Sequence, residues 1–228
     1  MKTGPDKIAI AKLVRSRRRT IELTITEDAR LVVSAPLRTP LHVIHGVIDK
    51  KQQWIRRKIS EAASRPAPPP REFRDGERFL FLGKAYDLEI SRRTARPVEL
   101  GDRLYMSNLA PPEARRALRE WYRGNAARHI SGRCAYYQRL IGRAPNRVRI
   151  SSAEKRWGSC SPGGNLNFSW RLMMAPPEVI DYIVVHEMAH LEVPNHSASF
   201  WKRVALVMPE YRVHKKWLKE NGHMLTID

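Results

Sequence analysis

Three histidines and one glutamate near the carboxyl end of the chain have the spacing of a metal site. Residues 181–201 read DYIVVHEMAHLEVPNHSASFW, and this segment contains the pattern HExxH from His186 to His190, with a further histidine at His196. Residues four apart lie on one face of a helix, so His186 and His190 can direct their imidazoles at one ion while Glu187 lies beside it. The apolar run before the motif predicts a buried helix.

A catalytic zinc ion usually has three protein ligands and one open position, which makes His196 the predicted third ligand. Pro194 cannot continue a helix and Asn195 tolerates a left-handed backbone, so the chain can bend and bring His196 back to the motif. We therefore predict one catalytic Zn²⁺ held by the three histidines. Because zinc lowers the pKa of its bound water and Glu187 can accept that proton, the predicted reaction is hydrolysis of a peptide bond.

Two alternatives to a peptidase stay open at the level of the sequence. In the first, the chain is a nucleic-acid-associated protein with a structural zinc ion; a net charge of 42 − 23 = +19 permits this, but a glutamate beside two ligands argues against it. In the second, the metal chemistry is kept and the hydrolysed bond is not a peptide bond, because the ligand set does not identify the substrate.

Length, charge and cysteine usage limit the class of protein. A chain of 228 residues predicts one or two domains. The first 100 residues hold 22 basic and 12 acidic residues and the rest hold 20 and 11, so the positive charge is spread along the chain and makes DNA or another polyanion a possible partner. Cys134 and Cys160 form no CxxC pattern, which favours a reducing, cytoplasmic setting. No signal peptide or membrane span is expected, and nothing indicates an oligomeric state.

The amino-terminal third predicts strands followed by a helix. Short alternating apolar runs within residues 8–36 predict small antiparallel strands, and residues 39–64 have the spacing of one amphipathic helix with Thr39 as its N-cap. The segment RPAPPPR, residues 65–71, cannot continue that helix and predicts an extended linker. The expected division is therefore a strand-and-helix region at 1–64, the linker, and a catalytic part at 72–228.

The remaining residues predict β-hairpins, a long helix and a second strand region before the motif helix. We expect a hairpin in residues 76–90 with its turn at Gly83-Lys84, a hairpin at 98–106, a helix over 111–141 that Gly124 and Gly132 could interrupt, strands at 147–152 and 165–173, and a helix from Pro177. The predicted class is α+β. The β-hairpin expected before the motif could offer a substrate-binding edge.

The segment KRWGSCSPGGNLNFSWRLMMAPPEVIDYIVVHEMAHLEVPNHSASFW, residues 155–201, resembles the YgjP-like metallopeptidase family, which is related to SprT-type and WLM-type zinc peptidases. Weaker similarity extends over nearly the whole chain. The resemblance implies a zincin-like catalytic core, zinc ligands at His186, His190 and His196, and a catalytic Glu187. The family itself implies no natural substrate; our expectation is a protein or peptide, and only the relation to SprT-type and WLM-type proteins, some of which act on DNA-bound proteins, points toward DNA repair.

Three further features have both a functional and a structural interpretation. The RWGSC segment, residues 156–160, could form a wall of the active site with Gly158 allowing close approach, or be a tight turn packed by Trp157. Cys160 could be a ligand, although the histidines already fill the expected ligand count, and a packed thiol is the simpler interpretation. Tyr211 could stabilise an oxyanion or belong to the core.

Overall fold

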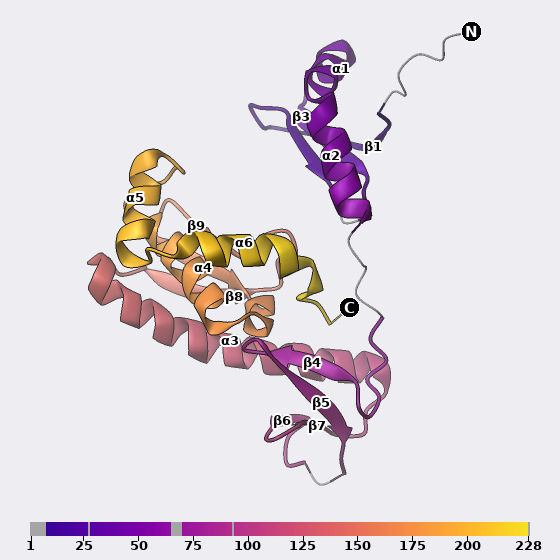
Figure 1. Cartoon of the computed structure of the whole chain (residues 1–228), viewed down its shortest axis with the longest axis vertical. Coiled ribbons are helices and arrows are strands. Elements are labelled where there is room, and N and C mark those ends of the chain that lie inside the picture. The colour runs from indigo at the N-terminus through magenta and orange to yellow at the C-terminus, as the bar shows by residue number, and fades with distance from the viewer. Residues whose placement is uncertain (1–7, 27, 65–69, 93, 228) are drawn as a thin grey trace. The chain divides into compact units, whose positions relative to one another are not determined.

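The computed structural model describes residues 8–26, 28–64, 70–92 and 94–227, and the chain divides into two compact units, Met1–Ala67 and Pro68–Asp228 (Figure 1). Each unit combines helices with a small sheet or sheets, so the predicted α+β class is confirmed. Of the linker predicted at 65–71, residues 65–69 lie outside the described residues.

The first unit packs two helices against a three-stranded sheet. Its elements are β1 (Ile10–Ser16), β2 (Glu22–Ile25), β3 (Leu31–Pro36), α1 (Leu41–Lys50) and α2 (Gln52–Ala63). The sheet order is β1-β3-β2, in which β2 and β3 are antiparallel but β1 and β3 are parallel. The expectation of antiparallel strands alone was therefore wrong: β2 and β3 form a hairpin, and β1 pairs with the other side of β3.

The single helix predicted over 39–64 is two helices in the structure. The break is at Lys51, whose backbone angles (φ −108°, ψ 10°) are not helical, and Pro40 rather than Thr39 is the N-cap of α1. The apolar spacing of the two helices is nevertheless the one expected, because Ile44, Ile48 and Ile55 are buried together. They form a core with the inward-facing residues of β3, which are Leu31, Val33 and Ala35.

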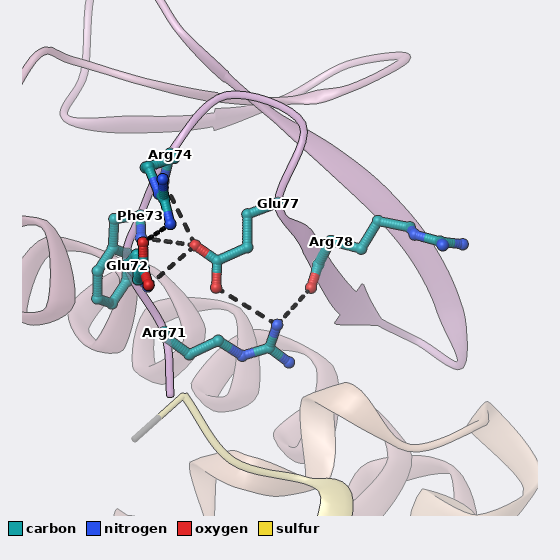
Figure 2. A network of polar contacts seen from close by, with 6 residues as sticks. All are labelled: Arg71, Glu72, Phe73, Arg74, Glu77 and Arg78. Carbon is teal, nitrogen blue, oxygen red and sulfur yellow. Dashed lines mark hydrogen bonds and ion pairs between the residues drawn. The ribbon is translucent and has the colours of Figure 1, made fainter. Parts of the chain in front are cut away.

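The second unit begins with a polar network that holds the chain before its first strand. The strands here are β4 (Arg78–Phe81), β5 (Lys84–Ile90), β6 (Val98–Leu100) and β7 (Leu104–Met106), in the order β4-β5-β7-β6. Figure 2 shows that one carboxylate oxygen of Glu77 accepts hydrogen bonds from the backbone N–H groups of Glu72, Phe73 and Arg74, at 3.2, 2.6 and 3.3 Å. Its other oxygen lies 3.5 Å from Arg71, which also donates to the carbonyl of Arg78.

The hairpin between β4 and β5 fixes the start of the motif helix. Its turn residues, Leu82 and Gly83, both have positive φ (48° and 77°), as a two-residue hairpin of type I′ requires. The Leu82 N–H donates to the carbonyl of Met173 at 2.7 Å, and a Cβ on Gly83 would lie 2.9 Å from the Cα of Pro176. The turn therefore packs directly against the residues that precede the motif helix.

A 31-residue helix, α3 (Pro111–Ile141), runs the length of the second unit beside the motif helix (Figure 1). Neither glycine interrupts it, and it ends before Gly142, whose left-handed conformation (φ 73°) closes the last turn. Arg133 on α3 forms two hydrogen bonds of 2.6 and 2.7 Å to the carboxylate of Asp181. This bidentate pair joins α3 to the motif helix.

A small sheet with the order β8-β10-β9 lies next to the motif helix; its strands are β8 (Arg147–Ser151), β9 (Gly158–Cys160) and β10 (Asn165–Ser169). The strand expected to continue to Met173 ends at Ser169, because Trp170–Met174 form a buried 3-10 helix, η1. The sequence did not indicate β9, which is three residues long and pairs antiparallel with β10 at the edge of the sheet. The chain ends with α4 (Pro177–Ala189), α5 (Ala198–Val207), α6 (Tyr211–Asn221) and η2 (Gly222–Met224).

Within the described residues, no helix has both the length and the apolar character that crossing a bilayer requires.

Candidate metal centre

The helix that carries the motif is buried on almost every side. Nine of its residues are buried, Glu187 among them, while His186 is half-buried. Helix α4 ends at Ala189, five residues before Pro194, so the proline is not what ends it. His190 is the C-cap, and the N–H groups of Leu191 and Val193 still bond to Met188 and Ala189. The chain then turns through Asn195 and enters α5 at Ala198, which places His196 opposite the helix end.

The structure brings the three predicted histidines together. The Nε2 atom of His196 lies 3.0 Å from that of His186 and 3.2 Å from that of His190. One ligand atom from each residue lies within 4.8 Å of the others. Nitrogen ligands at 2.0–2.1 Å from a tetrahedral zinc ion are separated by about 3.3 Å, so the observed spacing is close to that of a zinc site.

The hydrogen bonding of the rings also fits a metal site. The Nδ1 of His190 lies 2.9 Å from the carbonyl oxygen of Val193, so this nitrogen donates and the Nε2 of His190 carries a lone pair. Three ring nitrogens that face one another cannot all be satisfied by mutual hydrogen bonds, whereas one cation accepts all three lone pairs. The bond to Val193 is the kind of second contact that orients a ligating imidazole.

The surroundings favour the neutral, metal-binding form of two of the imidazoles, those of His186 and His196. Burial, followed by the charges of His190, His196 and Lys215, lowers the pKa of His186 to about 3. Burial also lowers the pKa of His196, again with help from His190 and Lys215. These two lowered pKa values favour the neutral, metal-binding form of His186 and His196 near neutral pH.

An aromatic layer supports the three rings from α5. The ring centroid of Phe200, which is fully buried, lies 4.9, 4.4 and 4.8 Å from those of His186, His190 and His196. Trp201 stacks on His196 with a centroid separation of 5.8 Å, and the Lys215 ammonium of α6 lies 4.0 Å above the Trp201 ring. The helix after the bend thus fixes the orientation of the ligands, and α6 adds a positive charge nearby.

Glu187 lies in a tight contact with the small sheet. Its side chain is 6% exposed, and burial raises the pKa of its carboxyl to about 7, an effect that the charge of Arg156 opposes. A Cβ built on Gly158 of β9 would lie 2.5 Å from the Cγ and 2.6 Å from the Oε1 of Glu187. Only glycine leaves room for the carboxylate here, so the strand backbone forms a wall beside Glu187. A cation at the histidines would lower the pKa of the Glu187 carboxyl again.

The other two candidate residues lie close to the centre but outside the histidine cluster. Cys160 is half-buried on β9, and its thiol pKa is raised by burial and by the negative charge of Glu187, which disfavours the thiolate that a metal needs. Tyr211 is 8% exposed and its ring stacks between those of Trp201 and Tyr182, at 5.2 and 6.5 Å. Cys160 and Tyr211 therefore both have the surroundings of packed side chains.

Sequence reasoning missed the aromatic layer of Phe200 and Trp201 and the positive charge of Lys215. Phe200 and Val204 are the two buried residues of α5, and this i, i+4 pair does predict an inward-facing stripe. The pair does not reveal that the stripe meets the histidines, because that depends on the bend between α4 and α5. Lys215 lies in a run of basic residues whose sequence gives no sign of which member faces the centre.

The model of the YgjP-like metallopeptidase domain matches residues 19–221. The chain belongs to the YgjP-like metallopeptidase family. Its structure is also similar to the crystal structure of the metallopeptidase zymogen of Pyrococcus abyssi abylysin, with 23% sequence identity over 40% of this chain and 92% of that chain, and a TM-score of 0.37. No curated protein matches the chain. Membership of the family supports a metal-dependent peptidase, and the three clustered histidines could hold the metal ion.

Proposed function

We propose that this protein is a zinc-dependent peptidase in which His186, His190 and His196 hold one Zn²⁺ and Glu187 is the general base. The observation that carries the proposal is the convergence of three imidazole nitrogens, with separations of 3.0 and 3.2 Å, near a buried glutamate. Three ligands leave the fourth position of a tetrahedral ion open, as a catalytic site requires. His196 is exposed, so this side of the site is accessible to solvent.

Each residue has a defined part in the reaction. When bound, zinc supplies Lewis acidity, which polarises the scissile carbonyl and lowers the pKa of a coordinated water. The Glu187 carboxylate accepts a proton from the attacking water while the water oxygen bonds to the carbonyl carbon. Glu187 then delivers that proton to the amine nitrogen as the carbon–nitrogen bond breaks. The close contact with Gly158 keeps the carboxylate in one orientation for both transfers.

Strand β9 supplies an edge for the peptide substrate. It lies at the end of the sheet order β8-β10-β9 and pairs only with β10 among the described strands. An extended peptide can add to such an edge through backbone hydrogen bonds. Because Gly158 of this strand touches Glu187, a peptide bound there passes the general base. The hairpin expected before the motif was wrong, because the two longer strands, β8 and β10, pair in parallel; the edge that we propose is the short antiparallel strand β9.

The decisive experiment compares wild type with Glu187→Gln after both have been loaded with zinc. Glutamine keeps the size of the side chain but cannot accept the proton. We expect both proteins to bind one zinc ion, measured by elemental analysis, and to unfold at similar temperatures. Casein cleavage by Glu187→Gln should fall by about 100-fold or more, the usual contribution of a general base. Removal of the metal with a chelator should abolish cleavage by wild type.

Each component of the proposal can fail separately. Equal cleavage by wild type and Glu187→Gln would exclude Glu187 as the base and leave the zinc with a structural role. If wild type binds no more zinc than His190→Ala, which lacks one proposed ligand, the metal site is excluded. If wild type binds zinc but cleaves neither casein nor a mixed peptide library, the protein is not a general peptidase, and hydrolysis of a non-peptide bond becomes the leading alternative.

A further inference from the structure

A polar cavity of about 250 Å³ opens on the small sheet next to Glu187. Its lining is Ser151, Ala153, Arg156, Gly158, Ser159 and Asn167. One of these residues, Gly158, also touches the Glu187 carboxylate, so the cavity and the general base lie on either side of one backbone segment. We call it the β9 pocket. Its position makes it accessible to a substrate that binds along β9.

The pairing of the strands decides which side chains share the face of this pocket. Ser159 lies directly opposite Asn167, and Asn167 lies directly opposite Arg149 on β8. Directly opposed residues project from the same face of a sheet. The alternate residues of β10, Leu166 and Phe168, are fully buried on the other face. The pocket therefore lies on the polar, outward face of the sheet.

The free edge of β9 directs a substrate residue toward this pocket. The Trp157 carbonyl accepts from the Ser169 N–H at 2.8 Å, and the Ser161 N–H donates to the Asn165 carbonyl at 2.9 Å, so the odd-numbered residues bond toward β10. Gly158 and Cys160 consequently turn their backbone groups to the open edge. A peptide strand paired with them places the side chain opposite Ser159 on the face that carries Ser159 and Asn167.

The chemistry of the pocket is suited to a carboxylate. Arg156 is the one charged residue of the lining, is exposed, and forms no ion pair or hydrogen bond with any residue that the structure describes. The side chains of Ser159 and Asn167 likewise have no hydrogen-bond partner among the residues that the structure describes. A guanidinium with a hydroxyl and an amide supplies several donors for one anion. A lysine side chain would meet a like charge there, and no acidic residue lines the pocket.

We propose that the β9 pocket is a substrate subsite that selects an aspartate or glutamate side chain close to the scissile bond, with Arg156 as the residue that determines this specificity. The inference rests on the proposed peptidase function and extends it to the class of substrate. Lys215, whose ammonium lies 4.0 Å above the Trp201 ring, adds a second positive charge to the approach of an acidic peptide.

The test uses peptides that differ at one residue. Glutamate, glutamine or lysine is placed in turn at each of the three positions on either side of a scissile bond cleaved by the zinc-loaded enzyme. We expect wild type to prefer glutamate to glutamine by about tenfold or more in kcat/KM at one position, because hydrogen bonds to charged groups are the stronger class. Arg156→Gln should lose this preference, and Arg156→Glu should prefer the peptide with lysine at that position.

The matched control is Lys155→Gln, which removes the same charge from the adjacent exposed residue outside the pocket. This variant should keep the preference of wild type. If Lys155→Gln and Arg156→Gln lose the preference equally, general charge rather than the pocket selects the substrate, and the inference is wrong. Cleavage by wild type without any preference for glutamate also overturns the inference and leaves the peptidase proposal intact.

A binding measurement separates this inference from the proposed function. A fluorescent glutamate-containing peptide is titrated against Glu187→Gln, and its anisotropy gives the dissociation constant without turnover. Adding Arg156→Gln to this background should weaken binding by about tenfold, whereas adding Lys155→Gln should leave it nearly unchanged. Equal binding by the two double variants contradicts the subsite even if no peptide is ever cleaved.

Discussion

Residue spacing along α4 fixes only part of the candidate centre. His186 and His190 are four residues apart on one helix, and the motif therefore predicts their common direction. The position of His196 depends on the six residues between the end of the helix at Ala189 and His196, and on its contact with the Phe200 ring. The buried state of Glu187 depends on Gly158, which is 29 positions away in the sequence.

Replacement of Gly158 tests whether the contact with Glu187 positions the carboxylate. In Gly158→Ala the new Cβ would lie 2.5 Å from the Glu187 Cγ, so the carboxylate must move. We expect kcat to fall by about 100-fold, as a shift of about 1 Å can cause, while zinc content stays at that of wild type. Gly163→Ala is the control, because its nearest neighbour would be Asn165 at 3.5 Å, an ordinary contact.

A second background distinguishes displacement of Glu187 from general damage to β9. Aspartate is shorter by one methylene group, so Glu187→Asp makes room for the alanine. The additional loss of kcat from Gly158→Ala should then be much smaller in the Glu187→Asp background than in wild type. Identical losses in both backgrounds would show that the glycine acts through the fold of the strand and not through Glu187.

At the scale of elements, the sequence predicts long regular segments better than short ones. The helix over 111–141 has a proline start, a sustained apolar stripe and Gly142 after its end, and it forms with these bounds. The three-residue strand β9 has no detectable alternation, and its pairing with β10 comes from tertiary contacts. The break at Lys51 is likewise invisible, because both α1 and α2 continue the same apolar spacing.

The network around Glu77 is an element-scale feature whose effect on stability can be measured. Glu77→Ala removes the acceptor for three backbone N–H groups and leaves Arg71 without its carboxylate, although both side chains are more than 80% buried. Phe73, held by the shortest of these bonds, has a positive φ of 57° that needs support. We expect a loss of about 2 kcal/mol in the free energy of unfolding, measured in urea.

Glu77→Gln supplies the matched comparison. The amide keeps one oxygen that can accept from the Phe73 N–H, but it loses the charge that faces Arg71. Its loss of stability should therefore be smaller than that of Glu77→Ala. If Glu77→Ala unfolds within about 0.5 kcal/mol of wild type, which is the range of ordinary surface substitutions, the network does not hold the start of this unit.

At the scale of the whole molecule, the two units carry nearly equal net positive charge, although the first has less than half the residues of the second. Residues 1–67 hold 15 basic and 6 acidic residues, a net charge of +9, and residues 68–228 hold 27 and 17, a net charge of +10. The hydrophobic cores, by contrast, are separate. The fully buried residues of the first unit form one cluster around Leu31 and Ile44, and those of the second form another around α3 and α4.

Separate cores predict that residues 68–228 fold and bind zinc without residues 1–67. All the candidate ligands, Glu187 and the β9 pocket belong to the second unit, and the buried residues around them come from that unit as well. We expect the fragment to bind one zinc ion with the affinity of the full chain and to unfold cooperatively, because its 161 residues are enough for a stable core. Isothermal titration and thermal unfolding of both proteins measure this.

Activity of the fragment then shows what the first unit contributes. If the fragment binds zinc normally and cleaves a short peptide at the rate of the full chain, the first unit is not needed for the chemistry, and a slower reaction on protein substrates alone would assign it to their recognition. If the fragment binds zinc at least tenfold more weakly or lacks a cooperative transition, the core of the second unit is not self-sufficient. The division of the chain into two independent units would then be wrong.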